Sequence, residues 1–498
     1  MKSFAFLFFV LLCVIVNKAD AQHSNVHLIV SGYSGDIDVL DPAVNYDPQK
    51  FISEVKPDKN GLATYSAEVS KSRYIVLYFN LPGAMSNRYI LYLSPGDDLS
   101  FKIKFSKNLP EISVSGKGSN NNQPEIFALT NIDLYRFKTD KTPDRIIAAI
   151  KQQEKSNYAL LQQYIKRYKP SASFIDNARE NCRYFAVSTY FENYNTGMQS
   201  FDEYPNHLKW KTIQDSLLRA HPMNNDGALT SFNYEHLVDF FIMQEPPIIL
   251  HDSVGKKAPY FYKHWYHTNI SEGKKMYAAE GRNAFIERII NKLFSGRAEE
   301  LAYADMFRWH IRFQHYEGLD IVFAHFKHKY PHSKYISIFE SSIASIVAKQ
   351  KQTLNNNMVF VAHNGTNLNT LNDVLRLVKG KTVFVDMWGT WCSPCREELA
   401  KYSPQIREHF RNKGVVFLYI AANDIDHEKT WKQLIAYYKV YGTHILANNK
   451  LNTDIMNRLN ATGNPTHFII RKDGSFKKMK SQDESQTQKV INEITEAL

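Results

Sequence analysis

The sequence predicts a multidomain protein with an N-terminal β-sandwich, a mainly α-helical middle domain and a C-terminal α/β domain. Its 498 residues exceed one hydrophobic core, since a typical domain takes roughly 150 residues. Strand-like runs separated by turn signals fill 22–118, apolar residues at helical spacing fill 119–352, and strand and helix patterns alternate in 353–498. We therefore expect three domains with these bounds, preceded by a leader over 1–21.

The leader has the three parts of a signal peptide. Lys2 gives a positive start, Phe4–Val16 is apolar, and Ala19-Asp20-Ala21 is a small-residue cleavage site. The apolar run is shorter than the roughly 20 residues that a spanning helix needs. We expect export with cleavage of the leader; an uncleaved N-terminal membrane anchor is the alternative.

The overall composition is that of a soluble globular protein, with 44% hydrophobic, 22% charged and 13% aromatic residues. The net charge is +11, but the basic residues are scattered and form no stripe alternating with aromatics. We therefore expect no nucleic-acid partner. No later segment is apolar over a length that would cross a bilayer.

The N-terminal strands are expected where β-branched and aromatic residues are dense between turn signals. Asn60-Gly61 and Pro95-Gly96-Asp97-Asp98 supply two such turns, and Gly116–Gln123 has the composition of a linker. The expected strands are Val26–Val30, Ala63–Val69, Tyr74–Phe79, Tyr89–Leu93 and Leu99–Phe105.

The middle region carries apolar stripes at helical spacing. One stripe consists of Ile147, Ile150, Tyr158, Leu161 and Ile165, and similar stripes occur in 282–294 and 335–349. Such stripes usually form a core. An aromatic-lined groove for a partner is the alternative reading.

The C-terminal region alternates between strands and helices and ends in a hairpin through Lys472-Asp473-Gly474. The near-continuous apolar run Thr382–Met387 has the pattern of a buried central strand. The other expected strands are Met358–Ala362, Val415–Ile420 and Thr466–Ile470, and the expected helices are Leu371–Val378, 392–411, 428–441, 451–460 and 485–497.

The number and spacing of the cysteines indicate a chemical role and not a set of structural disulfides. Of the 4 cysteines, Cys182, Cys392 and Cys395 remain after the leader, and the last two form a C-x-x-C pair. Half of a zinc site would need two further ligands at matching spacing, which the sequence lacks. We expect no metal and no cofactor. Cys182 is expected to be a buried free thiol, with a third redox partner as the alternative.

The position of the pair gives a physical reason for redox activity. The strand ends at Met387, and a short loop places Cys392 at the first turn of the next helix, where free N–H groups and the helix dipole favour a thiolate. Pro394 suits that first turn because its missing N–H costs nothing there. Cys395, one turn further on, is expected to be more buried and to resolve mixed disulfides.

The run Trp388-Gly389-Thr390-Trp391-Cys392-Ser393-Pro394-Cys395 resembles the W-x-x-W-C-x-P-C signature of the thioredoxin superfamily, and most closely its TlpA/ResA-like exported thiol-disulfide oxidoreductases. Gly463-Asn464-Pro465-Thr466 resembles the family's cis-proline segment. The resemblance implies a thioredoxin-like fold, Pro465 against the disulfide, and substrate contacts from Trp391, Pro394, Asn464 and Thr466.

Two carboxylates match family positions that relay protons. Asp386 resembles the buried acid of thioredoxins, and Glu398 resembles the glutamate of many ResA-like proteins. Since this chain has both, the sequence leaves open which of them serves Cys395. The family's proline five residues after the second cysteine is Ala400 here, and Pro404 follows a turn later, so any helix kink is displaced.

The resemblance implies a periplasmic reductase of protein disulfides. Such a protein needs a membrane electron donor of the DsbD/CcdA type, and oxidised exported proteins or apocytochrome thiols, as in cytochrome c maturation, are the implied substrates. A disulfide oxidase or isomerase, or a partner-binding module with an accessory redox pair, are the alternatives. The natural substrate, the direction, the oligomeric state and the role of residues 22–352 stay open.

Overall fold

The computed structural model describes residues 21–42, 46, 52–80, 87–106, 110–130, 142–196 and 207–498. The expected signal peptide therefore lies outside the described residues except for Ala21. Within the described part of the chain, no helix has the length and apolar character needed to cross a membrane. The backbone groups into two compact units: residues 1–309 with 325–338, and residues 310–324 with 339–498.

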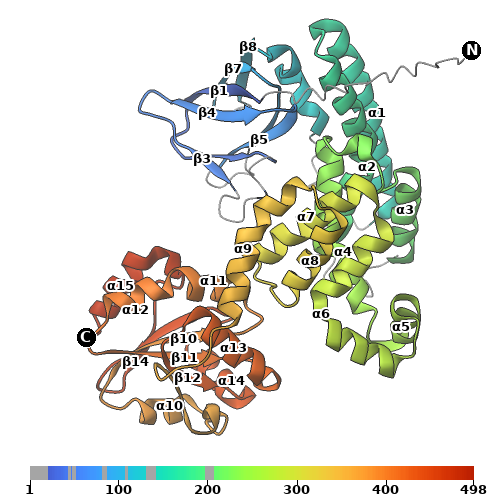
Figure 1. The fold of residues 1–498 in the computed structure, drawn as a ribbon. Helices are drawn as coiled ribbons and strands as arrows, with labels where there is room; N and C mark the ends of the chain where they lie inside the picture. The colour runs from blue at the N-terminus through green and yellow to red at the C-terminus, as the bar shows by residue number, and fades with distance from the viewer. Residues whose placement is uncertain are drawn as a thin grey trace, which may run out of the picture. The chain divides into compact units, whose positions relative to one another are not determined.

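The first unit begins with two four-stranded sheets, ordered β4-β1-β7-β8 and β3-β2-β5-β6 (Figure 1). Their strands are β1 (Gln22–Ser31), β2 (Ile37–Leu40), β3 (Ser53–Val55), β4 (Leu62–Val69), β5 (Arg73–Phe79), β6 (Asn87–Leu93), β7 (Asp98–Lys104) and β8 (Glu111–Lys117).

The two sheets share one apolar core because each strand turns alternate residues inward. Val26 and Leu28 of the first sheet are buried in the same cluster as Leu77 and Leu91 of the second. Gly61 precedes β4 with φ +76°, and a Cβ there would lie 1.9 Å from the Val30 carbonyl oxygen. Only glycine fits this expected turn.

All five N-terminal runs that the sequence predicts as strands lie in β1, β4, β5, β6 and β7. The sequence analysis missed β2, β3 and β8. The first two have only four and three residues. The third is mostly exposed, and its last two residues fall in the stretch expected to be a linker.

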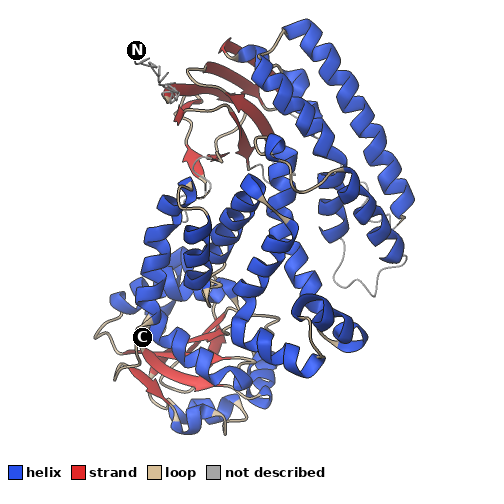
Figure 2. Cartoon of the chain, turned by 45° about the vertical axis from the view of Figure 1, so that its right-hand side comes forward, coloured by secondary structure: helices blue, strands red, loops and turns tan. Residues whose placement is uncertain are grey.

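Figure 2 shows the strands in two groups, and along the chain these groups are separated by helices. These helices are α1 (Pro143–Tyr168), α2 (Ala172–Thr196), α3 (His207–Ala220), α4 (Phe232–His251), α5 (Ala258–Tyr266), α6 (Ile270–Leu293), α7 (Gly296–Arg312), α8 (Leu319–Lys329) and α9 (Lys334–Gln350).

The predicted apolar stripe of α1 is partly wrong. Ile150 and Leu161 are buried as expected, but Tyr158 is 38% exposed, and Ile146 and Tyr164 take the inward positions instead. The helix presents a face rotated by about one residue from the predicted one, because its buried side packs against α2 and 124–130.

The second unit holds a six-stranded sheet ordered β14-β13-β10-β11-β12-β9. Central strand β10 pairs parallel with β11 and antiparallel with β13. The strands are β9 (Met358–Phe360), β10 (Thr382–Trp388), β11 (Val415–Ala421), β12 (Gly442–Leu446), β13 (Thr466–Ile470) and β14 (Phe476–Lys478). The helices are α10 (Leu371–Leu377), α11 (Ser393–Lys401), α12 (Ser403–His409), α13 (Glu428–Tyr438), α14 (Asn449–Arg458) and α15 (Thr487–Thr495).

Strand β10 is buried along its whole length, so its alternate residues serve two helical layers. Val383 and Val385 pack with α10 and α14 on one face. Phe384 packs with α12 and α15 on the other, and Trp388 packs there with α11 and α13. Asp386 shares the parity of Phe384 and Trp388, which places it on the α11 face.

Two expectations for this region are wrong in detail. The predicted helix 392–411 is two helices that meet at Tyr402, just before Pro404 in the first turn of α12. Strand β12 was not predicted, and the expected helix 428–441 ends instead at Tyr438.

Candidate active site

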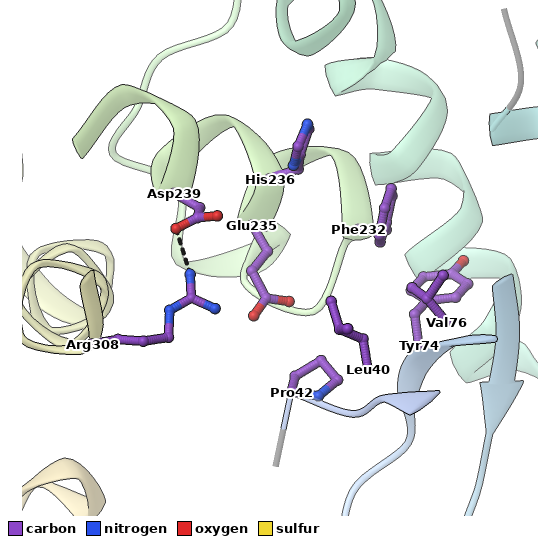
Figure 3. Close-up of a pocket in the computed structure, with 9 residues that line it drawn as sticks. All are labelled: Leu40, Pro42, Tyr74, Val76, Phe232, Glu235, His236, Asp239 and Arg308. Atoms are coloured by element: carbon purple, nitrogen blue, oxygen red, sulfur yellow. Dashed lines mark hydrogen bonds and ion pairs between the residues drawn. The ribbon is translucent and has the colours of Figure 1, made fainter. Parts of the chain in front are cut away.

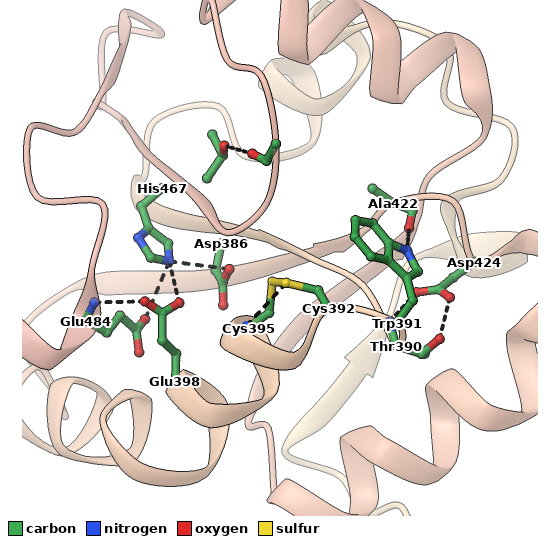
Figure 4. The surroundings of a disulfide bond; sticks show 12 residues. Asp386, Thr390, Trp391, Cys392, Cys395, Glu398, Ala422, Asp424, His467 and Glu484 are labelled. Atoms are coloured by element: carbon green, nitrogen blue, oxygen red, sulfur yellow. Dashed lines mark hydrogen bonds and ion pairs between the residues drawn. A yellow bond between two sulfur atoms is a disulfide. The ribbon is translucent and has the colours of Figure 1, made fainter. Parts of the chain in front are cut away.

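The two cysteines lie where β10 gives way to α11, and they form a disulfide with a Cα–Cα distance of 5.3 Å (Figure 4). Cys392 is the N-cap of α11, and its Sγ accepts a hydrogen bond from the Cys395 backbone N–H at 3.3 Å. Pro394 lies in the first turn, as expected. Both cysteines are buried, so the expected difference in exposure between them is small.

A buried carboxylate holds the loop before Cys392. Asp424 accepts hydrogen bonds from the Thr390 backbone N–H at 2.7 Å and from its hydroxyl at 2.6 Å. The Trp391 indole N–H donates to the Ala422 carbonyl at 3.0 Å, while the ring is 53% exposed. Burial raises the pKa of Asp424. Asp424 was not predicted as a site residue, although it follows the expected strand Val415–Ile420.

The segment that precedes β13 lies beside the same end of the sheet. The Asn464–Pro465 peptide bond is cis. Thr466 pairs in register with Met387, the residue before Trp388 at the end of β10. The Thr466 side chain is buried and its hydroxyl donates to the Gly463 carbonyl at 2.6 Å, so it serves the turn and is not open to a substrate.

Behind the disulfide, three buried carboxylates surround one histidine. Asp386 and His467 are register partners on β10 and β13, so their side chains share a face of the sheet. His467 Nε2 lies 3.5 Å from Asp386 Oδ1, 3.5 Å from Glu398 Oε2 and 3.9 Å from Glu484 Oε1. All four residues are buried, and Figure 4 shows their polar atoms converging. We call Asp386, Glu398, His467 and Glu484 the carboxylate–histidine cluster.

Burial shapes the protonation of this cluster. It raises the pKa of Glu398 and raises that of Glu484 to about 8, because ionised carboxylates lose their hydration there. Burial alone would lower the pKa of His467, but the carboxylates of Asp386, Glu398 and Glu484 beside its ring raise it well above its usual range. The cluster therefore favours bound protons near neutral pH.

The same atoms bear on metal binding. Within the described residues, Asp386, His467 and Glu484 offer one oxygen or nitrogen each within 4.8 Å of one another. A metal-bound histidine normally donates a hydrogen bond from its second ring nitrogen, yet His467 Nδ1 has no hydrogen-bond partner in the part of the chain that the structure describes. Glu484 is instead held by the Ser403 hydroxyl. The donor set therefore fits a metal ion poorly and fits shared protons better.

Neither His467 nor Glu484 was singled out in the sequence. The signal for His467 was available, because an antiparallel pairing of the two central strands brings it opposite Asp386. Glu484 reaches the cluster from the short helix 484–486 before α15, and its backbone N–H donates to Glu398 Oε1 at 3.0 Å. No local pattern marks such a contact.

A segment far back in the sequence also reaches α11. Arg396, next to Cys395, donates to the backbone carbonyls of Gln314 at 3.1 Å and Phe313 at 3.0 Å. Tyr316 packs against the apolar cluster that contains both cysteines. The loop between α7 and α8 thus belongs to the surroundings of the disulfide.

The third cysteine lies apart from this chemistry. Cys182 is a buried free thiol in α2 of the first unit, as expected. Burial raises its pKa to about 12, so it is held as a thiol and not as a reactive thiolate.

Comparison with known proteins decides the family. A family profile described as Thioredoxin-like matches residues 380–476, which span β10 to β14 and contain both cysteines and Pro465. One curated relative, the thiol-disulfide oxidoreductase ResA of Bacillus cereus, is 29% identical over 123 residues, which are 24% of this chain and 68% of that protein. The chain carries a thioredoxin-like domain of the TlpA/ResA type. The expected family and C-terminal fold are confirmed, and this domain is a thiol-disulfide oxidoreductase.

Two further relatives are matched over a smaller share of their own length. The ResA protein of Bacillus subtilis is 29% identical over 102 residues, 20% of this chain and 54% of that protein. The thioredoxin-like protein YneN of the same organism is 33% identical over 103 residues, 20% of this chain and 56% of that protein. The chain thus spans about half to two thirds of the length of these relatives.

Among solved structures, the thioredoxin domain of a thiol-disulfide oxidoreductase from Bacteroides vulgatus is 23% identical, with a TM-score of 0.21, and the match covers 25% of this chain and 82% of that one. A secreted disulfide oxidoreductase of Mycobacterium tuberculosis is 21% identical, with a TM-score of 0.19, over 24% of this chain and 85% of that one.

Proposed function

We propose that the thioredoxin-like domain reduces protein disulfides through a mixed disulfide at Cys392. The observation that carries the proposal is the position of Cys392 Sγ at the N-cap of α11, where it already accepts the Cys395 N–H. Helix N-termini stabilise anions, so the same place favours a thiolate once the disulfide is reduced.

The reaction balances within the pair. The Cys392 thiolate attacks one sulfur of a substrate disulfide, and the other substrate sulfur leaves as a thiolate that takes up a proton. Cys395 then loses its proton and attacks Cys392 Sγ, so the second substrate thiolate departs and the Cys392–Cys395 disulfide forms. Two electrons pass from the protein dithiol to the substrate.

Asp386 and Glu398 are the groups that we propose to exchange a proton with Cys395. Glu398 lies one helical turn beyond Cys395 on α11, and Asp386 lies on the strand that leads to Cys392, on the same face of the sheet. A buried carboxyl whose pKa is raised toward neutral pH suits general acid–base chemistry.

Substrate binding is proposed at the exposed rim of the disulfide. Trp391 and Pro394 are exposed beside Cys392, and Asn464 is half-buried before Pro465. An extended substrate segment could add to the backbone here as an extra strand. Thr466 enters this proposal through its backbone only, since its side chain is buried.

The wider biology is also proposal. We propose that residues 1–21 direct export to the periplasm and that a membrane donor of the DsbD/CcdA type returns electrons to Cys392 and Cys395. Exported proteins with oxidised cysteines, apocytochromes among them, are the proposed substrates. We keep the proposed division of the mature chain into a β-sandwich over 22–118, a helical domain over 119–352 and the redox domain over 353–498.

Paired cysteine variants test the proposed function. Cys392→Ser is expected to abolish reduction of insulin disulfides by the full-length protein, while Cys395→Ser is expected to trap substrates as mixed disulfides that mass spectrometry can identify. Cys182→Ser is the control and should retain full activity. Unchanged insulin reduction by Cys392→Ser would contradict the proposal.

The direction is tested separately by equilibrating the pair with glutathione buffers. A reductase should have a reduction potential well below that of the strong oxidants, which lie near about −120 mV. A potential in that oxidising range would instead favour the oxidase reading.

A further inference from the structure

His467 is the residue on which three buried carboxylates converge. Its Nε2 is equidistant, at 3.5 Å, from the Asp386 and Glu398 oxygens, and lies 3.9 Å from Glu484 Oε1. The ring is fully buried and stacks on Phe384 with a centroid distance of 5.5 Å. An imidazole fixed in this way has one N–H to offer to two carboxylates at once.

The cluster adjoins the resolving cysteine. Figure 4 shows the Asp386 side chain between His467 and Cys395. Glu398 follows Cys395 by three residues on α11, so the two lie on the same side of that helix. His467 therefore lies within 3.5 Å of both carboxylates that could serve Cys395.

We propose that His467 is a positioning residue for proton transfer at Cys395, holding Asp386 and Glu398 so that the carboxylate–histidine cluster acts as one proton store. The inference rests on the proposed function and deepens it. When Cys395 attacks the mixed disulfide, its proton passes to the cluster, the bond from Cys392 to the substrate sulfur breaks, and the departing substrate thiolate takes a proton from water.

Glu484 extends this store by one residue. Its backbone N–H donates to Glu398 Oε1 at 3.0 Å, and its Oε2 accepts from the Ser403 hydroxyl, which leaves Oε1 directed at His467. Burying three carboxylates beside a single imidazole is unfavourable unless some of them keep protons. The arrangement itself therefore points to protonated carboxyls in the resting protein.

The neighbouring charged groups are few. Four of them act on His467 directly: Asp386 of β10, Glu398 of α11, Glu484 of 484–486 and Asp483 beside it. Tyr419 of β11 interacts with Asp386 and Glu484, and Arg407 of α12 interacts with Tyr419. Arg407 donates to the Tyr419 hydroxyl at 2.9 Å. Within the described residues, His467 is the one basic group that lies within 4.0 Å of the three carboxylates.

The same sheet supplies a matched control. His444 of β12 is also fully buried, but its Nε2 lies 2.9 Å from the Val440 carbonyl and its ring stacks on Tyr419. Burial lowers the pKa of His444 to about 4, so it is held neutral. Replacing His444 disturbs the core without removing a contact to Asp386 or Glu398.

The test separates the two cysteines in one assay. Fully reduced full-length protein is mixed with an aromatic disulfide that releases a coloured thiolate. Attack by Cys392 gives the first release and a mixed disulfide; attack by Cys395 on that mixed disulfide gives the second release. Both rates are followed between about pH 5 and about pH 9 in His467→Gln, Glu484→Gln and His444→Gln.

We expect His467→Gln to slow the second release at least about tenfold near pH 7 while changing the first less than about twofold. The rate of the second release in His467→Gln should depend on pH as expected for one titrating carboxyl group. Glu484→Gln, which guards against misfolding of the histidine variant, should move the midpoint of the profile with a smaller loss of rate. His444→Gln should leave both releases close to wild type.

Three outcomes would overturn the inference. In the first, the second release in His467→Gln keeps the wild-type rate and pH profile. In the second, His467→Gln and His444→Gln slow both releases to the same extent, which indicates a structural role only. The third is a stoichiometric metal ion in the purified protein that His467→Gln loses. Absence of any second release in the wild-type protein would instead contradict the proposed function.

Discussion

Each unit of the molecule gathers carboxylates around one basic side chain, and the hydrogen bonding of the two groups differs. In the first unit the base is Arg308, with Glu235, Asp239 and Asp305 near it, and Figure 3 shows Asp239 paired with the guanidinium at a small pocket. In the second unit the base is His467, with Asp386, Glu398 and Glu484.

The arginine group is held mainly by hydrogen bonds, although Asp305 Oδ2 has no hydrogen-bond partner among the described residues. Arg308 Nη2 donates to Asp239 and, at 3.1 Å, to Asp305, while the Tyr46 hydroxyl donates to Asp305 at 2.9 Å. The Trp309 indole N–H also donates to Asp239. A guanidinium stays charged at every physiological pH, so this group is suited to holding β-strand and helix segments of the first unit together.

The histidine group is left open. Among the described residues, both oxygens of Asp386 and one oxygen each of Glu398 and Glu484 have no hydrogen-bond partner, although they are buried. An imidazole can gain or lose its proton near neutral pH. The comparison teaches that a buried charge group built around arginine serves structure, whereas one built around histidine can also store a proton.

The largest expected effect comes from breaking the arginine group. Arg308→Met should destabilise the first unit by about 3–5 kcal/mol, because Asp239 and Asp305 lose the charge that compensates their burial. Hydrogen exchange measured by mass spectrometry would report the loss of protection peptide by peptide.

The control for this variant is Arg167→Met, which removes an exposed pair with Glu125 and should cost less than about 1 kcal/mol. Both variants should keep the disulfide exchange of the second unit. Equal loss of protection in the two variants would contradict the structural role assigned to the Arg308 group.

The next effect is a dependence of stability on pH, expected in both units with the same sign. Burial raises the pKa of Glu484 to about 8 and that of Glu235 to about 7, so the native state binds a proton that the unfolded state releases above about pH 4.5. Stability should therefore fall as pH rises from about 5 to about 8, on the order of 5 °C in the unfolding temperature of each unit.

Single amide variants assign the two contributions. Glu484→Gln should flatten the pH dependence of the second unit, and Glu235→Gln should flatten that of the first. His467, whose pKa is also raised, should add to the loss above about pH 6.5 in the second unit, since its proton is lost on unfolding there. A stability that rises with pH over this range would contradict the assigned protonation.

Local sequence was enough for the parts of the fold and site that depend on neighbouring residues. Strand β10 is buried at every position, and its unbroken apolar run predicted this. Cys392 and Cys395 were found because strand, loop and helix signals adjoin them. Strand β12 was missed because the residue that follows α13 in a left-handed conformation is Lys439, with φ 51°, and not a glycine that would mark the end of the helix.

The site contacts that could not be predicted join residues that lie far apart in the sequence. His467 meets Asp386 only through the register of β10 and β13, and Glu484 reaches Glu398 from 86 residues away. Asp424 supports Thr390 across the parallel pair β10 and β11. These contacts depend on tertiary packing, which periodicity and motif spacing do not encode.

The smallest effect concerns the loop between α7 and α8, which neither charge group contacts. Arg396 donates two hydrogen bonds to backbone carbonyls, at Gln314 and Phe313, and a lysine cannot reproduce this fork. Arg396→Lys should cost about 1–2 kcal/mol and raise hydrogen exchange in residues 310–324. Lys401→Arg, on the exposed end of the same helix, is the control and should change neither. If Arg396→Lys left exchange in 310–324 unchanged but altered the second thiolate release, the residue would act on Cys395 directly, and the histidine group would not be the sole influence on proton transfer there.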